Sequence, residues 1–144
     1  MDALKDQYFT TDFYQKLTDK THSVYPDLDK NQFLSAITYN RESLELKERL
    51  KLCSLVLSEQ LPQNYPIALD LILKIAPSFS GFVGVIFPDF VASYGLNHYE
   101  TSIKALELLT TYSSSEFAIR AFLRNYPKQT LKQMETWSLN KNEH

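Results

Sequence analysis

The chain has 144 residues, of which 44% are hydrophobic and 22% charged, and its formal net charge is −2. This composition excludes an intrinsically disordered chain and fits one domain over residues 1–144, which can bury about two thirds of its unfolded surface without disulfides or metals. Because the opening residues are charged, the one cysteine has no partner and no apolar run reaches membrane-spanning length, we expect a cytoplasmic protein with neither a secretory signal nor a membrane partner.

Apolar residues recur at helical spacing along the chain, and period-two alternation is nearly absent, so the predicted fold class is all-α. The first helix is expected from just after Thr10 or Thr11 to about His22. The second and third are expected at residues 28–39 and 41–60. Cys53 continues an apolar line of leucines in the third helix, which favours a buried side chain over a nucleophile.

The second half of the chain is punctuated by proline and glycine. Pro66 suits the first position of a fourth helix, where its missing N–H costs nothing. Residues 78–86 contain two glycines and predict a long connection between helices, with a short strand as the alternative. Pro88 is expected to open a short helix that ends near Tyr94, with Gly95 in the usual C-terminal position.

Two polar clusters predict the starts of later helices. Asn97 and the acid three positions later, Glu100, have the spacing of a capping box. Ser113 and Glu116 repeat this spacing and start the next helix, which Pro127 separates from a final one. Helix pairs joined by short polar turns indicate a HEAT-like helical-repeat solenoid. A plain helical bundle is the alternative, because the residues show no strict repeat period.

The charge is distributed unevenly along the chain. The first sixty residues hold ten acids and eight bases, whereas residues 117–144 hold five bases and two acids. Cationic side chains recur every four residues in the second segment, on either side of Pro127. They are Arg120, Arg124, Lys128 and Lys132. This spacing predicts a modest basic patch that binds DNA phosphates, and a solvated helix face is the plain alternative.

Glu116 begins this series and has two interpretations. As a structural residue it caps its own helix and forms a surface ion pair with Arg120, which contributes about 0.3–0.5 kcal/mol. As a catalytic residue it is a carboxylate framed by cations, which suits an enzyme that approaches a polyanion and stabilises a positive charge. No metal site or cofactor is expected, because His22, His98 and His144 have no ligand-like spacing and no glycine-rich phosphate loop occurs.

Distinctive stretches are spread over nearly the whole chain. They are MDALKDQYFTTDFYQKL, SLELKERLKLCSLVLSEQLP, FPDFVASYGLNHYETSIKALELLT, SSEFAIRAFLRNYPKQTLKQM and the closing NEH. Together they resemble the AlkC-like branch of the DNA alkylation repair proteins. The resemblance implies a HEAT-like DNA glycosylase that excises cationic methylated purines such as 3-methyladenine from double-stranded DNA without flipping the base. It places Glu116 at the position of a catalytic acid and Arg120 on the DNA face.

The chain departs from the family pattern at two places. Arg120-Ala121-Phe122 stands where the family commonly has arginine–proline–phenylalanine. The family pattern also continues past the closing NEH into a basic helix with a second acid and a tryptophan. We therefore expect the N-terminal part of a longer architecture with an incomplete active site, which leaves its activity as an enzyme open. The alternative function is a non-catalytic HEAT-like scaffold that binds nucleic acid or a protein partner.

Overall fold

The computed structural model describes residues 2–142, which contain α-helices and short 3-10 helices and no strand. The α-helices are α1 (Asp2–Tyr8), α2 (Thr11–Val24), α3 (Lys30–Ile37), α4 (Leu46–Gln60), α5 (Tyr65–Ile75), α6 (Ile86–Tyr94), α7 (Tyr99–Leu109), α8 (Glu116–Asn125) and α9 (Pro127–Asn142). The 3-10 helices are η1 (Arg41–Ser43), η2 (Ala76–Ser78) and η3 (Val83–Val85). The predicted all-α class is confirmed. Within the described range, no helix is both long and apolar enough to cross a membrane.

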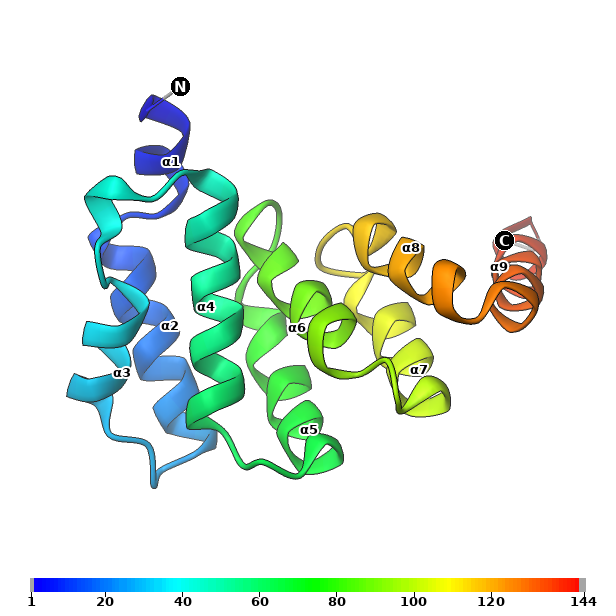
Figure 1. The fold of residues 1–144 in the computed structure, drawn as a ribbon, viewed down its shortest axis with the longest axis horizontal. Helices are drawn as coiled ribbons and strands as arrows, with labels where there is room; N and C mark the ends of the chain where they lie inside the picture. The colour runs from blue at the N-terminus through cyan, green and yellow to red at the C-terminus, as the bar shows by residue number, and fades with distance from the viewer. Residues whose placement is uncertain (1, 143–144) are drawn as a thin grey trace.

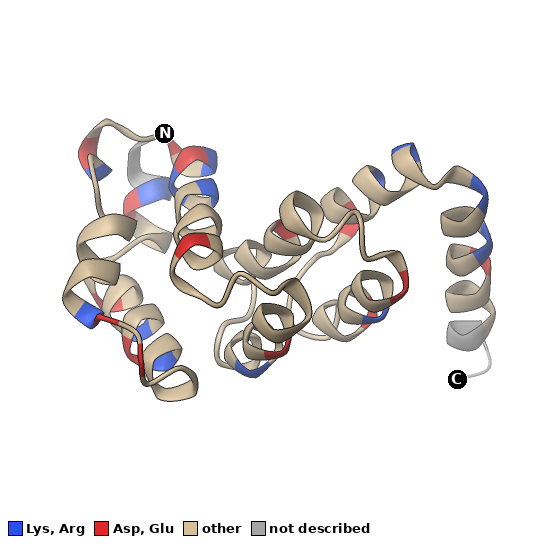
Figure 2. Ribbon diagram, turned by 60° about the horizontal axis from the view of Figure 1, so that its bottom comes forward, with Lys and Arg blue, Asp and Glu red and all other residues tan. Residues whose placement is uncertain are grey.

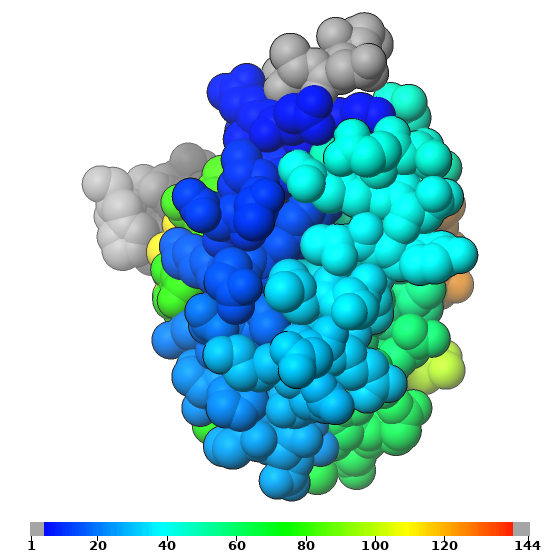
Figure 3. All heavy atoms as spheres, turned by 90° about the vertical axis from the view of Figure 1, so that its left-hand side faces the viewer, coloured from blue at the N-terminus to red at the C-terminus, as the bar shows by residue number. Residues whose placement is uncertain are grey.

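The helices stack in chain order in two layers (Figure 1). One layer consists of α4, α6 and α8, and the other consists of α2, α5 and α7. At the N-terminal end α3 packs against both α2 and α4, and these segments close that end of the molecule (Figure 3). At the opposite end α9 packs on α8 and crosses it steeply (Figure 1). This sequential stacking is a HEAT-like solenoid, so the bundle alternative is wrong.

The N-terminal helices have clear local start signals. Thr10 accepts a hydrogen bond from the Phe13 N–H at 3.0 Å and caps α2, and Asp29 caps α3 in the same way. The predicted helix over 41–60 is wrong in its first turn. Asn40 has a left-handed φ of 54°, and α4 begins only at Leu46. Glu48 fixes that start, because its carboxylate accepts the N–H of Glu45 at 2.8 Å.

The helix α1 was not predicted from periodicity, and its contacts explain why. Lys5 Nζ donates to the Leu44 carbonyl at 3.1 Å, and the Lys5 carbonyl lies 3.4 Å from Arg49 Nη1. Both partners are about forty positions away in the sequence. Tertiary contacts of this kind hold a short helix that is marginal by itself.

Residues 78–86 contain the end of η2, the whole of η3 and no strand, so the predicted connection is confirmed. The helix α6 follows directly and begins at Ile86, two residues before Pro88, where the sequence had predicted the start. Gly81 adopts a φ of +73°, and its N–H donates to the Tyr112 carbonyl at 3.1 Å. A Cβ on Gly84 would lie 2.8 Å from the Phe79 carbonyl oxygen and 3.0 Å from Ser113 Cβ. These two glycines let the connection pack against the loop that precedes α8.

Both predicted caps of the later helices are wrong. The N-cap of α7 is His98, whose ring stacks on Tyr65 with 4.8 Å between the centroids, so Glu100 no longer falls three positions after the cap. The N-cap of α8 is Ser115, not Ser113. The Ser115 hydroxyl donates to the Leu106 carbonyl at 3.3 Å and caps no N–H of its own helix. Tertiary contacts therefore decide where these helices begin.

Candidate functional site

A hollow of about 540 Å³ lies at the start of α8. Its walls are the serine-rich loop 113–115, one side of α8 and Met134 of α9. Glu116 and Arg120 both line it. The structure thus brings together two of the predicted site residues at a concave surface with hydroxyl groups, and the other three lie outside the lining.

Glu116 and Arg120 form the ion pair that their spacing predicts. Arg120 Nη2 donates to Glu116 Oε1 at 2.9 Å, and the two side chains are 65% and 74% exposed, respectively. The Glu116 N–H lies 3.4 Å from Ser114 Oγ. The carboxylate therefore faces both solvent and the hollow, which fits the ion-pair part of the structural interpretation and leaves the group accessible to a ligand.

The four predicted cations lie on two helices. Arg120 and Arg124 share a face of α8, and Lys128 and Lys132 share a face of α9. Tyr126 separates the helices with φ −138° and ψ 64°, so the series bends between its two halves. Figure 2 shows cationic positions along both helices.

These cations are solvent-exposed, and their partners are few. Among the described residues, Arg120 has the ion pair with Glu116, and no ion pair involves the other three. Exposed cations that form no ion pair are available to phosphate groups, although exposure alone fits a solvated helix face equally well.

The predicted absence of a metal site rests on three histidines, of which His144 lies outside the described residues. Ring stacking occupies His98. Over residues 2–142, no group of three or more His, Cys, Asp or Glu side chains is placed to hold a metal ion. Cys53 is fully buried, as predicted, and burial raises the pKa of its thiol well above the ordinary value, so the reactive thiolate is disfavoured.

Sequence reasoning missed a junction between α4, α6 and α8. Lys51 Nζ lies 2.7 Å from Asp89 Oδ1 and 5.2 Å from the centre of the Phe117 ring. The three residues also line one apolar hollow of about 190 Å³. They are separated by 38 and 28 positions in the sequence, so no local pattern could have linked them.

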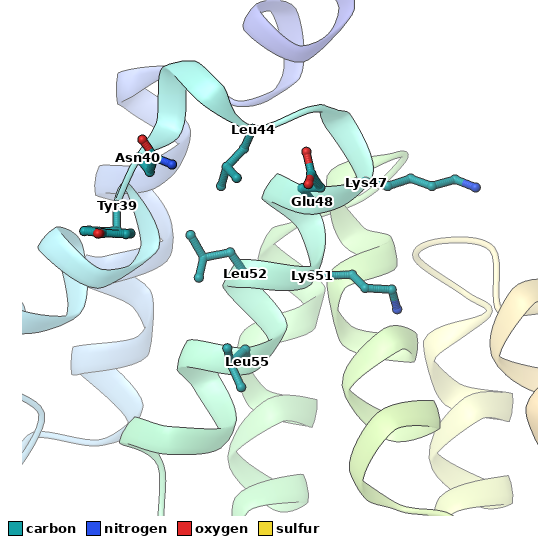
Figure 4. Close-up of a pocket in the computed structure, with 8 residues that line it drawn as sticks. All are labelled: Tyr39, Asn40, Leu44, Lys47, Glu48, Lys51, Leu52 and Leu55. Carbon is teal, nitrogen blue, oxygen red and sulfur yellow. The ribbon is translucent and has the colours of Figure 1, made fainter.

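A further hollow of about 420 Å³ lies between the η1 segment and α4. It is mainly apolar, with Tyr39, Leu44, Leu52 and Leu55 around it (Figure 4). In the same view Lys47 and Lys51 extend from α4 in the direction opposite to Tyr39. The hollow contains none of the predicted site residues.

Comparison with known proteins places the chain beside longer relatives. No family model matches it. It is 43% identical over 145 residues to the uncharacterized protein YhaZ of Bacillus subtilis (strain 168). This alignment covers 100% of the chain and 40% of YhaZ. The structure of Pseudomonas fluorescens alkylpurine DNA glycosylase AlkC, bound to DNA containing an abasic site analog, superimposes with a TM-score of 0.87 at 35% identity.

That superposition covers 94% of this chain and 38% of the AlkC chain. The chain thus spans about two fifths of the length of both proteins. Identity above one third together with this superposition confirms the resemblance recognised in the sequence motifs. Over the length that it shares with that glycosylase, the chain is similar to AlkC in sequence and in fold.

Proposed function

We propose that this chain acts in DNA alkylation repair, as part of a DNA glycosylase that hydrolyses the N-glycosidic bond of cationic alkylated purines such as 3-methyladenine. Its partner is double-stranded DNA that contains such bases, and the base is removed without being flipped. The observation that carries the proposal is the superposition on the DNA-bound glycosylase AlkC. The position of Glu116 and Arg120 in one hollow gives this proposal a chemical centre.

Glu116 is the proposed catalytic residue. The alkylated base already carries a positive charge and leaves as a neutral molecule, so it needs no general acid. Positive charge develops on the deoxyribose as the bond to the base breaks, and water then adds to the carbon that lost the base and gives up a proton to solvent. A carboxylate about 4 Å from that charge contributes roughly 4 kcal/mol at an effective dielectric constant near 20. This corresponds to about a thousandfold in rate.

Arg120, Arg124, Lys128 and Lys132 are the proposed DNA-binding residues. Phosphate contacts fix the position of a protein on the duplex and carry no base specificity. The Arg120–Glu116 pair also keeps a cation beside the carboxylate. This cation reduces the repulsion between the Glu116 carboxylate and an approaching DNA phosphate. The bend between α8 and α9 suits contacts to the phosphate backbone of curved DNA.

Release of 3-methyladenine from a duplex tests the catalytic role. Base release should fall about a thousandfold in Glu116→Gln, because the amide is nearly isosteric and carries no charge. DNA affinity should change little, since the carboxylate does not bind phosphate. Equal rates for the two proteins would remove Glu116 from the mechanism.

A non-catalytic scaffold is the second candidate, and one observation favours it. The Glu116 side chain is 74% exposed, as in an ordinary surface ion pair. A scaffold binds DNA containing alkylated bases, or a protein partner, without releasing any base. DNA binding with no detectable base release from the unmodified chain would support this candidate over the enzyme.

A further inference from the structure

Outside the proposed site, a buried acid lies in α6, the middle helix of its layer. Asp89 lies in the first turn of α6 and is 2% exposed. Burying a carboxylate is costly unless a cation or hydrogen bonds compensate it. Lys51 Nζ provides that compensation at 2.7 Å, and it reaches Asp89 from the neighbouring helix α4.

The same ammonium group also contacts α8. It lies 5.2 Å from the centre of the Phe117 ring, within the range of a cation–π interaction. Phe117 is 52% exposed, so the core does not enclose its ring. One lysine therefore connects all three helices of the layer, and at α8 it contacts the residue that follows Glu116.

The first turn of α8 has weak local support. Its N-cap residue Ser115 forms no capping hydrogen bond, because its hydroxyl is directed to the Leu106 carbonyl. The contacts that remain within this turn are the long Glu116 N–H to Ser114 Oγ contact at 3.4 Å and the exposed Glu116–Arg120 pair.

The buried Ala118 and Phe122 seat α8 on the core. Successive helical residues point about 100° apart. Fixing the Phe117 ring against Lys51 therefore adds a restraint on the rotation of the first turn, which carries Glu116 at the hollow.

We propose that Asp89 and Lys51 are positioning residues: Asp89 holds the Lys51 ammonium against the Phe117 ring, and this contact fixes the first turn of α8 and the direction of the Glu116 carboxylate. Neither residue touches the reacting atoms. The inference rests on the proposed function for its catalytic consequence, whereas its structural content stands independently of catalysis.

Amide hydrogen exchange tests the structural content. The Ile119 N–H donates to the Ser115 carbonyl at 2.9 Å and reports on the opening of the first turn of α8. Its exchange should accelerate about tenfold in Lys51→Met, which removes the charge and keeps an unbranched side chain. Lys51→Arg should restore slow exchange. Phe117→Leu should reproduce the acceleration from the other side of the contact, and its exposed position makes it compatible with folding.

A matched control removes another paired surface lysine. Lys74 on α5 lies 3.4 Å from Asp70 in an exposed pair, and α5 belongs to the other layer. Lys74→Met should leave the Ile119 amide unchanged. Unchanged exchange in Lys51→Met as well would overturn the proposal, whatever the protein does to DNA.

Single-turnover release of 3-methyladenine tests the catalytic consequence. In Lys51→Met the rate should fall about tenfold with DNA affinity unchanged, because small misplacements of a catalytic group are costly in rate. A loss of affinity with a flatter salt dependence and an unchanged rate would instead make Lys51 a phosphate contact and overturn positioning. If the unmodified chain releases no base, the proposed function fails, and the exchange experiment still decides whether Lys51 positions α8.

Discussion

The two ends of the solenoid use arginine in opposite ways. At the N-terminal end Arg49 is 1% exposed, and it donates to the Leu44 and Lys5 carbonyls and to Asp6. At the C-terminal end Arg120 is 65% exposed and Arg124 is also exposed. The N-terminal cation is committed to holding α1 and the segment before α4 in place, whereas the C-terminal cations remain accessible.

This difference shows that charge in a sequence has no function until its burial is known. The first sixty residues contain eight bases, against five in residues 117–144, yet some of the former are used internally. Lys5 and Arg49 are buried and bonded to backbone carbonyls. The basic character of the C-terminal end comes from exposed cations with few acidic neighbours, more than from their number.

Arg49→Ala should give the largest effect on stability. It leaves a cavity at a fully buried position and removes one of the two donors from each of the Leu44 and Lys5 carbonyls, so the free energy of unfolding should fall by about 3 kcal/mol. Urea denaturation measures this. Arg124→Ala is the exposed counterpart and should change stability by less than about 0.5 kcal/mol. Similar losses of stability in the two variants would contradict the distinction between a buried structural arginine and an exposed one.

Tyr14, beside Arg49, should make stability fall at high pH. Burial raises the pKa of its hydroxyl to about 12, the nearby Cys53 thiol adds to this, and Arg49 and Arg41 oppose it. The unfolded chain loses this proton near pH 10 and the folded chain near pH 12. The free energy of unfolding therefore falls by about 2 kcal/mol as pH rises through this window. Below pH 10 the contribution of Tyr14 to stability is fully present.

Tyr14→Phe provides the control for this pH effect. The Tyr14 hydroxyl is buried without a hydrogen-bond partner among the described residues, so its removal should be neutral or slightly stabilising at pH 7. The stability curves of the two proteins, measured by urea unfolding, should diverge between pH 10 and 12. Parallel curves would mean that the hydroxyl titrates normally in the folded chain.

Gly84→Ala tests whether the C-terminal end depends on close packing at its loop. The new Cβ would meet the Phe79 carbonyl and Ser113, so the free energy of unfolding should fall by about 1–2 kcal/mol. Gly81→Ala meets no neighbouring atom and should cost about 1 kcal/mol through its positive φ alone. Amide exchange in residues 110–116 should accelerate in the first variant more than in the second.

Local signals predicted much of this fold and little of its long-range organisation. Periodicity and proline predicted α2, α3, the body of α4 and α5 because those signals act within a few residues. The capping prediction at Asn97 failed because His98 stacks on Tyr65, which lies on another helix. At the site, four-residue spacing correctly predicted the Glu116–Arg120 pair, since both lie on one helix. The Lys51–Asp89–Phe117 junction joins three helices, and only the folded chain brings those residues together.

Arg124→Ala should give the smallest effect on binding and the sharpest test of the C-terminal basic surface. Each lost phosphate contact should reduce the slope of log affinity against log salt concentration by about 0.9, and affinity should fall at low salt. Filter binding or fluorescence anisotropy on duplex DNA at several salt concentrations measures both. Lys104→Ala on α7, in the other layer, also removes an exposed cation and should leave the slope unchanged. An equal slope change in both variants would mean that DNA senses only net charge, and the distinction between a dedicated binding end and the rest of the surface would disappear.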